Sequence, residues 1–269
     1  MLPLSCWPAP ERRGIVGVFT DIDDTLTTEG AITPDALQAL AQLKAAGLYV
    51  IAITGRPIGW TLPFATSWPV DALVAENGAV ALMPTRARDE NGLQPPSKLY
   101  QQDAVTRATN HAAMRTVAEQ VLREVPSARL ARDEGGRETD LAFDYAEFNH
   151  MEPHAVQQVL DILSRAGMHT SISSIHIHGC FGDFNKWNGA CWIARELLQR
   201  DLTQEINHWA FVGDSGNDQV MFQHFTHSVG VANVRRFAER LTHLPRYITP
   251  SERGAGFAEM VQTLISAKS

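Results

Sequence analysis

The feature that most constrains the fold is a run of six residues, 15–20, that is almost continuously apolar and ends in acidic residues. A strand with one solvated face alternates polar and apolar residues, whereas this run does not, so it indicates a buried strand of a parallel sheet. Thr33 and Pro34 mark the start of a helix, Gly47 marks its end, and a second apolar strand follows over 48–53. Strand, helix and strand within about 40 residues are typical of a right-handed parallel crossover.

The last third of the chain repeats this pattern. The expected elements are a helix over 186–200, a strand over 208–212, a short helix over 218–224, a strand over 228–231, a helix over 234–241, a strand over 247–249 and a C-terminal helix. The two halves together predict one open α/β sheet, Rossmann-like and doubly wound, with an insertion between them.

The middle of the chain mixes strand-like alternation with amphipathic helices, which predicts a small α+β domain. Its expected elements are a polar loop over 85–96, helices over 103–125 and 153–166, and strands over 141–148 and 171–178. The predicted boundaries are 1–12 for an N-terminal tail, 13–83 and 182–269 for the α/β core, and 84–181 for the inserted domain.

Composition excludes several classes of protein. The 269 residues are 44% hydrophobic and 20% charged, which is enough apolar material for a buried core. A net charge of −7 argues against a surface for nucleic acid or anionic membrane. No apolar run approaches the ~18 residues that cross a bilayer, and the N-terminus does not resemble a signal peptide. Three cysteines, Cys6, Cys180 and Cys191, suit a reducing compartment. We therefore expect a cytoplasmic monomer or homodimer.

Acidic residues follow the first expected strand directly. Alternate residues of an extended segment point the same way, so Asp21 and Asp23 are expected side by side at the carboxyl end of the strand, where open α/β sheets bind ligands. A calcium loop does not fit, because its sixth position would be Leu26 and its twelfth Ile32. An acidic surface turn is the alternative interpretation.

A second acidic segment, GDSGND at 213–218, follows another expected strand. By itself it could be a turn with a helix cap. Two acidic strand ends in one sheet can instead converge on one ion, and their oxygen ligands favour Mg²⁺.

Two further elements indicate a phosphate-binding site only because they accompany these acidic segments. Thr54 and Gly55, at the end of strand 48–53, offer a hydroxyl and backbone N–H groups to phosphate oxygens. Lys186 begins a helix after a glycine-containing segment. A lysine is usually solvated, but near several aspartates and a phosphate it would neutralise charge.

The four elements DIDDT, ITGR, NK and GDSGND stand in the order found in the haloacid dehalogenase-like phosphohydrolase superfamily, which the chain resembles over 16–79 and from 181 to its end. The sequence ENGA at 76–79, followed by an insertion, is similar to the branch of Cof-type sugar phosphatases, sucrose-phosphate phosphatase, mannosyl-3-phosphoglycerate phosphatase and phosphomannomutase. The chain departs from the family at Asp24, where Gly is common. Asp23 and Thr25 beside it keep the family pattern.

The resemblance implies that Asp21 is a nucleophile that forms an aspartyl-phosphate, and that Asp23 protonates the leaving oxygen and then deprotonates water. The other implied roles are Mg²⁺ binding by Asp21, the Asp23 carbonyl and Asp214, ordering of ligand waters or Lys186 by Asn217 and Asp218, and phosphate binding by Thr54, Gly55 and Lys186.

The leading hypothesis is a Mg²⁺-dependent phosphatase for a small phosphorylated metabolite, a sugar phosphate or phosphoglycerate derivative. The nearest alternative is a phosphomutase of the phosphomannomutase type, which uses the same aspartyl-phosphate. A receiver-like switch and a catalytically silent interaction protein are more distant alternatives. The large insertion argues against a receiver-like switch, and the four intact elements argue against a catalytically silent protein.

The inserted domain, as a cap, is expected to supply specificity and to exclude water. Its polar candidates are Arg132, Arg137, Asp140, Asp144, Asn149, His150, His176 and His178. Of these we expect His178, together with Arg56 of the core, to contact the substrate. His176, His178 and Cys180 alternate along one strand, so a zinc site is an alternative, although no fourth ligand is evident. Trp60 and Trp187 could form an apolar wall for a sugar or pack in the core.

Overall fold

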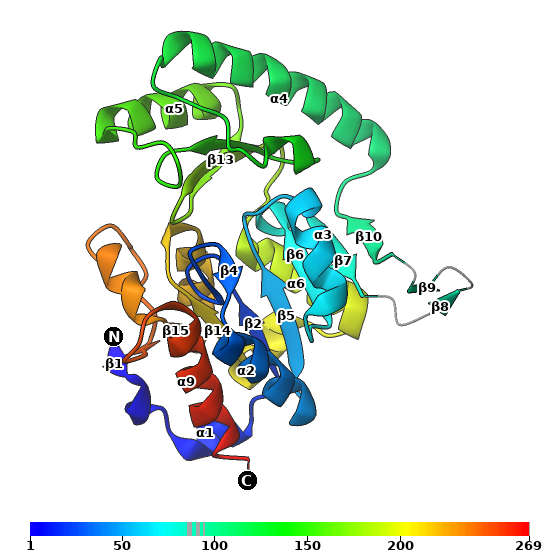
Figure 1. Ribbon diagram of the computed structural model, residues 1–269, viewed down its shortest axis with the longest axis vertical. Coiled ribbons are helices and arrows are strands. Elements are labelled where there is room, and N and C mark those ends of the chain that lie inside the picture. Colours follow the sequence, from blue (N-terminus) through cyan, green and yellow to red (C-terminus); the bar gives the residue numbers. More distant parts are fainter. Residues whose placement is uncertain (85–87, 90–91, 94, 269) are drawn as a thin grey trace.

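The computed structural model describes residues 1–84, 88–89, 92–93 and 95–268. Within these residues, nine strands form one large sheet (Figure 1). In sheet order they are β1 (Leu2–Pro3), β16 (Tyr247–Ile248), β15 (His227–Gly230), β14 (Trp209–Gly213), β2 (Gly17–Thr20), β5 (Tyr49–Ile53), β6 (Ala72–Ala75), β7 (Val80–Met83) and β10 (Ser97–Tyr100). The pairs from β1 to β6 are parallel, whereas β7 pairs antiparallel with both β6 and β10.

Helices cover both faces of this sheet, which explains why every residue of the central strand β2 is buried. One apolar layer joins the sheet to α2 (Pro34–Ala45), α3 (Ile58–Ser67) and α9 (Arg253–Ile265). A second layer joins it to α6 (Lys186–Leu198), α7 (Leu202–Glu205) and α8 (Gln219–His224). The predicted α/β fold is confirmed.

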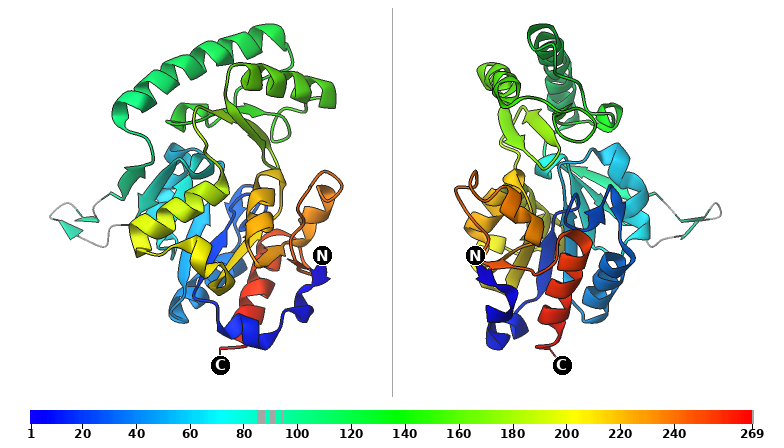
Figure 2. Two further views of the ribbon diagram at one scale, coloured as in Figure 1. Left: turned by 180° about the vertical axis from the view of Figure 1, so that it is seen from behind. Right: turned by 60° about the vertical axis from the view of Figure 1, so that its left-hand side comes forward.

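A smaller antiparallel sheet lies above the large one, with strand order β11 (Leu141–Asp144), β13 (His176–Cys180) and β12 (His169–Ile172). The helices α4 (Ala104–Glu124) and α5 (Pro153–Arg165) pack on its outer face, and its other face turns toward the large sheet (Figures 1 and 2). We call residues 104–180 the cap, and the large sheet with its helices the core.

The remaining elements are short. They are η1 (Leu4–Cys6), α1 (Ala9–Arg13), β3 (Thr27–Thr28), β4 (Ala31–Ile32), η2 (Glu76–Gly78), β8 (Arg88–Asp89), β9 (Gly92–Leu93), η3 (Glu134–Gly136), η4 (Ile206–His208), η5 (Gly216–Asp218) and η6 (Ala232–Arg236), where η denotes a 3₁₀ helix. Among the described residues, no helix is both long enough and apolar enough to span a bilayer.

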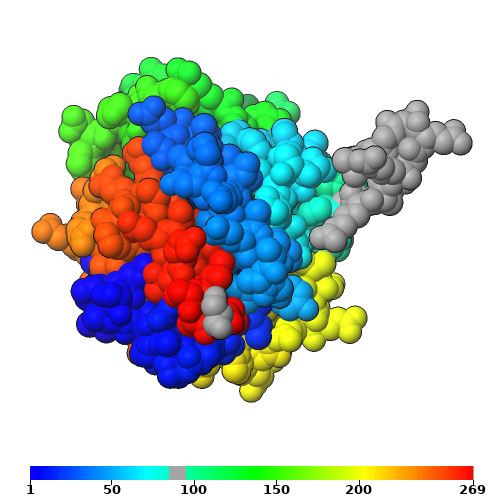
Figure 3. All heavy atoms as spheres, turned by 60° about the horizontal axis from the view of Figure 1, so that its bottom comes forward, coloured from blue at the N-terminus to red at the C-terminus, as the bar shows by residue number. Residues whose placement is uncertain are grey.

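The first residues of the chain are not the free tail that was predicted. β1 pairs with β16 at the edge of the large sheet, and the side chains of Leu4 and Trp7 are buried in the apolar layer that includes α9. Figure 3 shows this N-terminal segment packed beside the C-terminal helix. The segment is short and rich in proline, so its composition alone does not predict that Leu4 and Trp7 pack against distant parts of the core.

Several predicted elements differ in extent. The strand expected over 141–148 ends at Asp144, because its carboxylate accepts hydrogen bonds from the backbone N–H groups of Glu147 and Phe148 and closes a turn. The strand expected over 171–178 is divided between β12 and β13. The helix expected over 234–241 is only the 3₁₀ helix η6 followed by turns, since few of its side chains are buried.

Two differences concern the predicted insertion. Residues 97–100, which the predicted boundaries place in the inserted domain, form β10 and join the core sheet. The polar loop expected over 85–96 lies partly outside the described residues, and its described parts include the paired strands β8 and β9.

The cap meets the core closely beside the carboxyl ends of the strands. A methyl group added to Gly59 in α3 would lie 2.8 Å from the Cα of Gly136, so the two backbones pack directly. The buried carboxyl group of Glu76 accepts hydrogen bonds from the N–H groups of Ile58 and Thr139, 3.1 and 2.5 Å away. Glu76 thus links helix α3 to the segment that leads into β11.

Candidate active site

The predicted functional residues gather at the carboxyl ends of neighbouring strands. Asp21 follows β2, Thr54 follows β5 and Asp214 follows β14, and these three strands are adjacent in the sheet. Lys186 is the first residue of α6 and Asp218 ends the turn η5 after Asp214. Parallel strands present their carboxyl ends at one edge, so residues far apart in sequence converge there.

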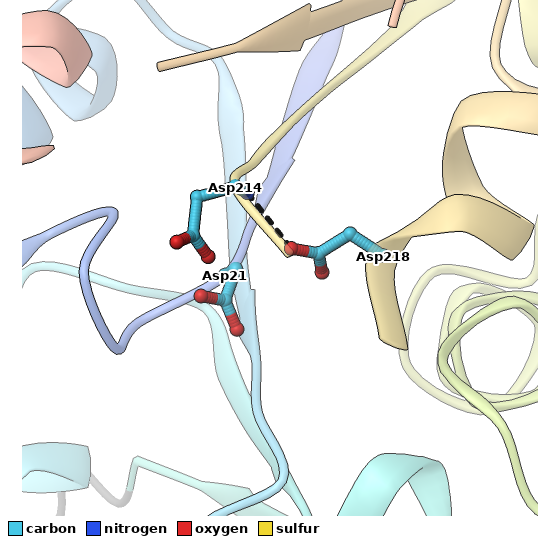
Figure 4. Close-up of side chains that lie close together, drawn as sticks. All are labelled: Asp21, Asp214 and Asp218. Carbon is cyan, nitrogen blue, oxygen red and sulfur yellow. Dashed lines mark hydrogen bonds between the residues drawn. The ribbon is translucent and has the colours of Figure 1, made fainter. Parts of the chain in front are cut away.

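Three carboxylates and one ammonium group form the centre of the site. Ligand oxygens of Asp21, Asp214 and Asp218 lie within 4.8 Å of one another, and all three residues are buried (Figure 4). The Nζ of Lys186 donates hydrogen bonds to Asp21 Oδ1 and, over 2.6 Å, to Asp218 Oδ1. The second oxygen of Asp218 accepts bonds from the N–H groups of Asp214 and Ser215. Asp218 therefore holds both Lys186 and the backbone turn in place.

This cluster carries more negative than positive charge in a buried place. Burial raises the pKa of Asp21 to about 8, against the lowering effect of Lys186 and with a further rise from Asp218. Burial also raises the pKa of Asp214 well above its usual value, and the neighbouring Asp21 adds to that rise. Both pKa shifts arise first from burial and then from the neighbouring carboxylates, and the ammonium group of Lys186 offsets them only in part.

Asp214 has one oxygen held and one without a partner. Its Oδ2 accepts a hydrogen bond from Asn233 Nδ2 at 2.8 Å, whereas its buried Oδ1 has no hydrogen-bond partner among the described residues. The sequence reasoning missed Asn233. It lies just beyond β15, whose carboxyl end is at the same edge of the sheet, so its position after a strand was the available signal.

The side chain of Asp23 is held by two residues of the next strand end. Arg56 Nε donates to Asp23 Oδ1 over 2.9 Å, and Thr54 Oγ1 lies 3.4 Å from Asp23 Oδ2. Beyond β2 the chain turns and is no longer extended, yet Asp21 and Asp23 still line one cavity. Thr54 also accepts a bond from the N–H of Arg56, which orders this turn.

Arg56 was predicted to contact the substrate, but here it binds carboxylates of the protein. Besides Asp23, it pairs with two cap residues, Asp133 at 3.1 Å and Glu147 at 2.8 Å. Sequence reasoning did not identify Asp133 or Glu147, because an acidic residue in a polar segment is indistinguishable from a solvated one. Arg56 therefore joins the cap to the Asp23 side chain.

A small cavity of about 10 Å³, roughly the space of one water molecule, lies between the core residues and the cap. It is lined by Asp21, Asp23, Gly55, Arg56, Ser215 and Asn217 from the core and by 173–176 and His178 from the cap. Of the cap candidates from the sequence, only His176 and His178 line it.

The other cap candidates are not among the residues that line this cavity, and most of them contact other groups of the protein. Arg137 and Asp140 are buried and paired with each other, Asp144 closes the turn after β11, and Asn149 donates to the carbonyls of Ser127 and Asp144. Arg132 stacks over the exposed ring of Phe148, and His150 is exposed.

The remaining residues singled out in the sequence have partners within the protein. Of the two residues predicted to order ligand waters or Lys186, Asp218 accepts a hydrogen bond from Lys186, and Asn217 Nδ2 donates one to Asn77 Oδ1. Trp60 packs on Phe64 and Trp187 stacks on His224, and neither lines the cavity. His176, His178 and Cys180 do not form a metal-binding group, since the only such group in the described residues is that of the three aspartates.

Asp24, the departure from the family pattern, occupies a left-handed turn. Its φ is +55°, a conformation in which glycine is free of strain. Its carboxylate pairs with Arg253 Nε at 3.0 Å, and its backbone carbonyl accepts a bond from Asn233. The aspartate therefore preserves the turn and adds an ion pair with the start of α9.

Comparisons with known proteins agree with this arrangement. Residues 18–121 match the sequence model of haloacid dehalogenase-like hydrolases. No match is found among curated proteins.

Solved structures share the fold over almost the whole chain. Protein 0175 of Thermoplasma acidophilum superposes with a TM-score of 0.70 at 18% identity, covering 93% of this chain and 98% of that one. The sucrose-phosphatase of Synechocystis sp., solved with sucrose and phosphate, gives 0.64 at 15% identity, covering 94% and 98%. A protein of Bacteroides thetaiotaomicron, described among the phosphatases of the haloalkanoate enzyme superfamily, gives 0.63 at 16% identity, covering 94% and 96%. The match over residues 18–121, the shared fold and the four sequence elements at one edge of the sheet together make the chain similar to the haloacid dehalogenase-like hydrolases.

Proposed function

We propose that this hydrolase is a Mg²⁺-dependent phosphatase that acts on a small phosphorylated metabolite, a sugar phosphate or a phosphoglycerate derivative, through a phosphorylated Asp21. The observation that carries the proposal is the buried cluster of Asp21, Lys186, Asp214 and Asp218 at the strand ends. Such a cluster has a carboxylate nucleophile, a fixed cation and free oxygen ligands in one place, which is what phosphoryl transfer needs.

The residues present fit a magnesium ion. The Oδ1 of Asp214 is a buried oxygen that has no partner among the described residues, and burial together with the neighbouring carboxylates raises the pKa of Asp21 and of Asp214, so a cation bound there would offset both effects. Asp218 already has both oxygens engaged, so the side chains of Asp21 and Asp214 would hold the ion, with the Asp23 carbonyl as the third ligand. A bound Mg²⁺ would neutralise charge on the phosphoryl oxygens.

The protein's own groups would divide the chemistry among them. A carboxylate oxygen of Asp21 attacks phosphorus, the ester oxygen leaves with a proton from Asp23, and Asp23 then takes a proton from the water that hydrolyses the phosphoaspartate. Lys186 holds Asp21 in position and offsets its charge. Thr54 and the Gly55 N–H would hold phosphoryl oxygens, and the cap would exclude bulk water.

A panel of phosphorylated sugars and glycerates, assayed for free phosphate with Mg²⁺ and again with EDTA, tests the proposal. We expect phosphate release that requires Mg²⁺ and no bisphosphate activator. Release only with a bisphosphate, together with isomerised sugar phosphate, would instead indicate a mutase.

Asp21→Asn tests the nucleophile. The substitution keeps the shape of the side chain but removes the attacking carboxylate, so we expect turnover to fall by at least about 10³-fold while the fold persists. Asp24→Asn, three residues along the same turn, is the matched control and should retain activity. Near-normal turnover by Asp21→Asn would refute the nucleophile assignment.

A further inference from the structure

His178 lies in β13, the central strand of the cap sheet, and its side chain points toward the core. Its neighbour Ile177 belongs to the apolar layer beneath α4 and α5, and side chains alternate along a strand, so His178 faces the other way. It lines the cavity that contains Asp21 and Asp23. Only 3% of its surface is exposed, so whatever it contacts is inside the protein.

The ring of His178 is held in one orientation by a buried carboxylate. Nδ1 lies 3.1 Å from Asp140 Oδ2, and Asp140 Oδ1 accepts a hydrogen bond from Arg137 Nη1 at 2.7 Å. Burial alone would raise the pKa of Asp140, but Arg137 and His178 lower it, so the group is a carboxylate. A carboxylate can only accept hydrogen bonds, which places the hydrogen of the neutral imidazole on Nδ1 and a lone pair on Nε2.

The lone pair on Nε2 is unused. Nε2 is buried and has no hydrogen-bond partner among the described residues. It lies beside Gly55, where a methyl group would come within 2.9 Å of it. Burial lowers the pKa of His178 to about 4, against the opposing effect of Asp140, so the ring is neutral near pH 7. A buried acceptor without a donor is costly, which indicates that a ligand supplies the donor.

The chemistry of that donor follows from the surroundings. Phosphoryl oxygens of a dianionic ester are acceptors and do not complement a lone pair. A hydroxyl group on the organic part of the substrate, close to the ester oxygen, does. We propose that His178 Nε2 accepts a hydrogen bond from such a hydroxyl and thereby selects hydroxylated phosphate esters over esters that lack the hydroxyl. This inference rests on the proposed phosphatase function.

A single hydrogen bond to a buried acceptor sets the size of the effect. An ester without the hydroxyl would leave Nε2 unpaired, and losses of that kind correspond to about 10-fold to 100-fold in kcat/KM. Gly55 contributes to this selection, because any larger residue there would push the imidazole away.

The test compares glycerol 1-phosphate with propyl phosphate, which has the same carbon chain and no hydroxyl. With the full chain and Mg²⁺, the wild type should prefer the glycerol ester by about 10-fold to 100-fold in kcat/KM. His178→Ala should lose most of that preference, because its kcat/KM should fall by at least about 10-fold more on the glycerol ester than on propyl phosphate. His178→Gln, whose amide oxygen can still accept, should recover part of the preference.

His154→Ala, an exposed histidine of the same domain, is the matched control and should keep the wild-type preference. Binding of the two esters to Asp21→Asn, with and without His178→Ala, gives a second readout that does not depend on turnover and should show the same loss of discrimination.

The outcomes separate the inference from the proposed function. Equal losses on both esters in His178→Ala, or a wild type that hydrolyses p-nitrophenyl phosphate without preferring the glycerol ester, overturns the role of His178. A wild type that releases phosphate from none of the three esters contradicts the phosphatase function itself.

Discussion

At the scale of single residues, the site contains more buried carboxyl groups than buried cations. Lys186 is shared by Asp21 and Asp218, while Asp214 has only the amide of Asn233 as a partner. Asp21 and Lys186 are thus paired in the absence of any ligand, and the remaining charge of Asp214 is uncompensated. Burying a charge without a counter-charge is expensive, so the cluster should respond strongly to a divalent cation and to protons.

We predict that Mg²⁺ stabilises the protein more at pH 8 than at pH 6. A carboxyl group whose pKa is higher in the folded than in the unfolded protein favours folding at low pH, and this contribution is lost as pH rises through the folded value, about 8 for Asp21. Without Mg²⁺, the free energy of unfolding should therefore decline toward pH 8, as the buried carboxyl groups lose their protons. A bound Mg²⁺ would then offset the negative charge that the protons no longer neutralise. An increase in Tm of about 2–4 °C with 10 mM Mg²⁺ at pH 8 is expected, measured by thermal unfolding against EDTA.

Asp214→Asn is the control for this prediction. It removes one buried charge, so without Mg²⁺ the variant should be at least as stable as the wild type at pH 8 and should gain nothing from the cation. A Mg²⁺ response equal to that of the wild type would contradict the assignment of Asp214 as a ligand.

At the scale of elements, helix α6 is placed by direct backbone packing. A side chain at Gly189 would overlap the backbone of Gly78, whose φ is +114°. The turn at 76–78 therefore fixes how closely α6 approaches it. Because α6 begins with Lys186, the same contact helps to position that lysine. The position of Lys186 depends on Gly78 and Gly189, two residues that have no functional side chain.

We predict that Gly189→Ala is destabilising, although alanine normally stabilises a helix interior relative to glycine. The added methyl should push α6 from the turn, with a loss of about 1–3 kcal/mol in the free energy of unfolding and a larger fall in kcat than in substrate binding. Urea denaturation and steady-state kinetics measure the two effects. Gly135→Ala is the control, because an added methyl there meets no atom within 4 Å, and it should change neither the stability nor the kinetics. A Gly189→Ala variant as stable and active as the wild type would contradict the prediction and show that the packing can adjust.

At the scale of the whole molecule, the cap is closed on the core. The cavity beside Asp21 is about 10 Å³, too small for a phosphate ester, so the proposed substrate would enter only if the cap moved. That movement must separate Arg56 from Asp133 and Glu147. Burial alone would raise the pKa of Glu147, but His176 and Arg56 outweigh it and lower the value to about 2, so the pairing is ionic at neutral pH.

We predict that Glu147→Gln increases opening of the cap. Loss of about 1 kcal/mol from the pairing with Arg56 should raise amide hydrogen exchange about 5-fold at 173–178 and leave the central strands β2 and β14 unchanged. Hydrogen exchange followed by mass spectrometry measures this. Glu124→Gln, an exposed residue on α4, should have no effect. An equal rise in β2 and β14 would mean that the variant destabilises the entire protein.

Local patterns in the sequence were enough to place much of the site. The apolar run before Asp21 predicts β2, and the acidic segment after 208–212 predicts the end of β14, because burial on both faces and a following turn leave marks within a few residues. Thr54 and Lys186 could be located in the same way, each at the boundary of one element. The weaker predictions, such as the helix over 234–241 and the N-terminal tail, concern segments whose structure is decided by distant partners.

The sequence by itself determined the α/β order of strands and helices and the positions of the acidic residues and the lysine along them, since these depend on periodicity and on strand ends. Only the tertiary structure decided that Arg56 binds Glu147, 91 residues away, that Asn233 holds Asp214, and that His178 is fixed by Asp140 with a free nitrogen beside Gly55. The composition of each segment does not indicate its partner in such a contact. These contacts form only when one face of the cap sheet packs over the edge of the core sheet and brings buried charges together.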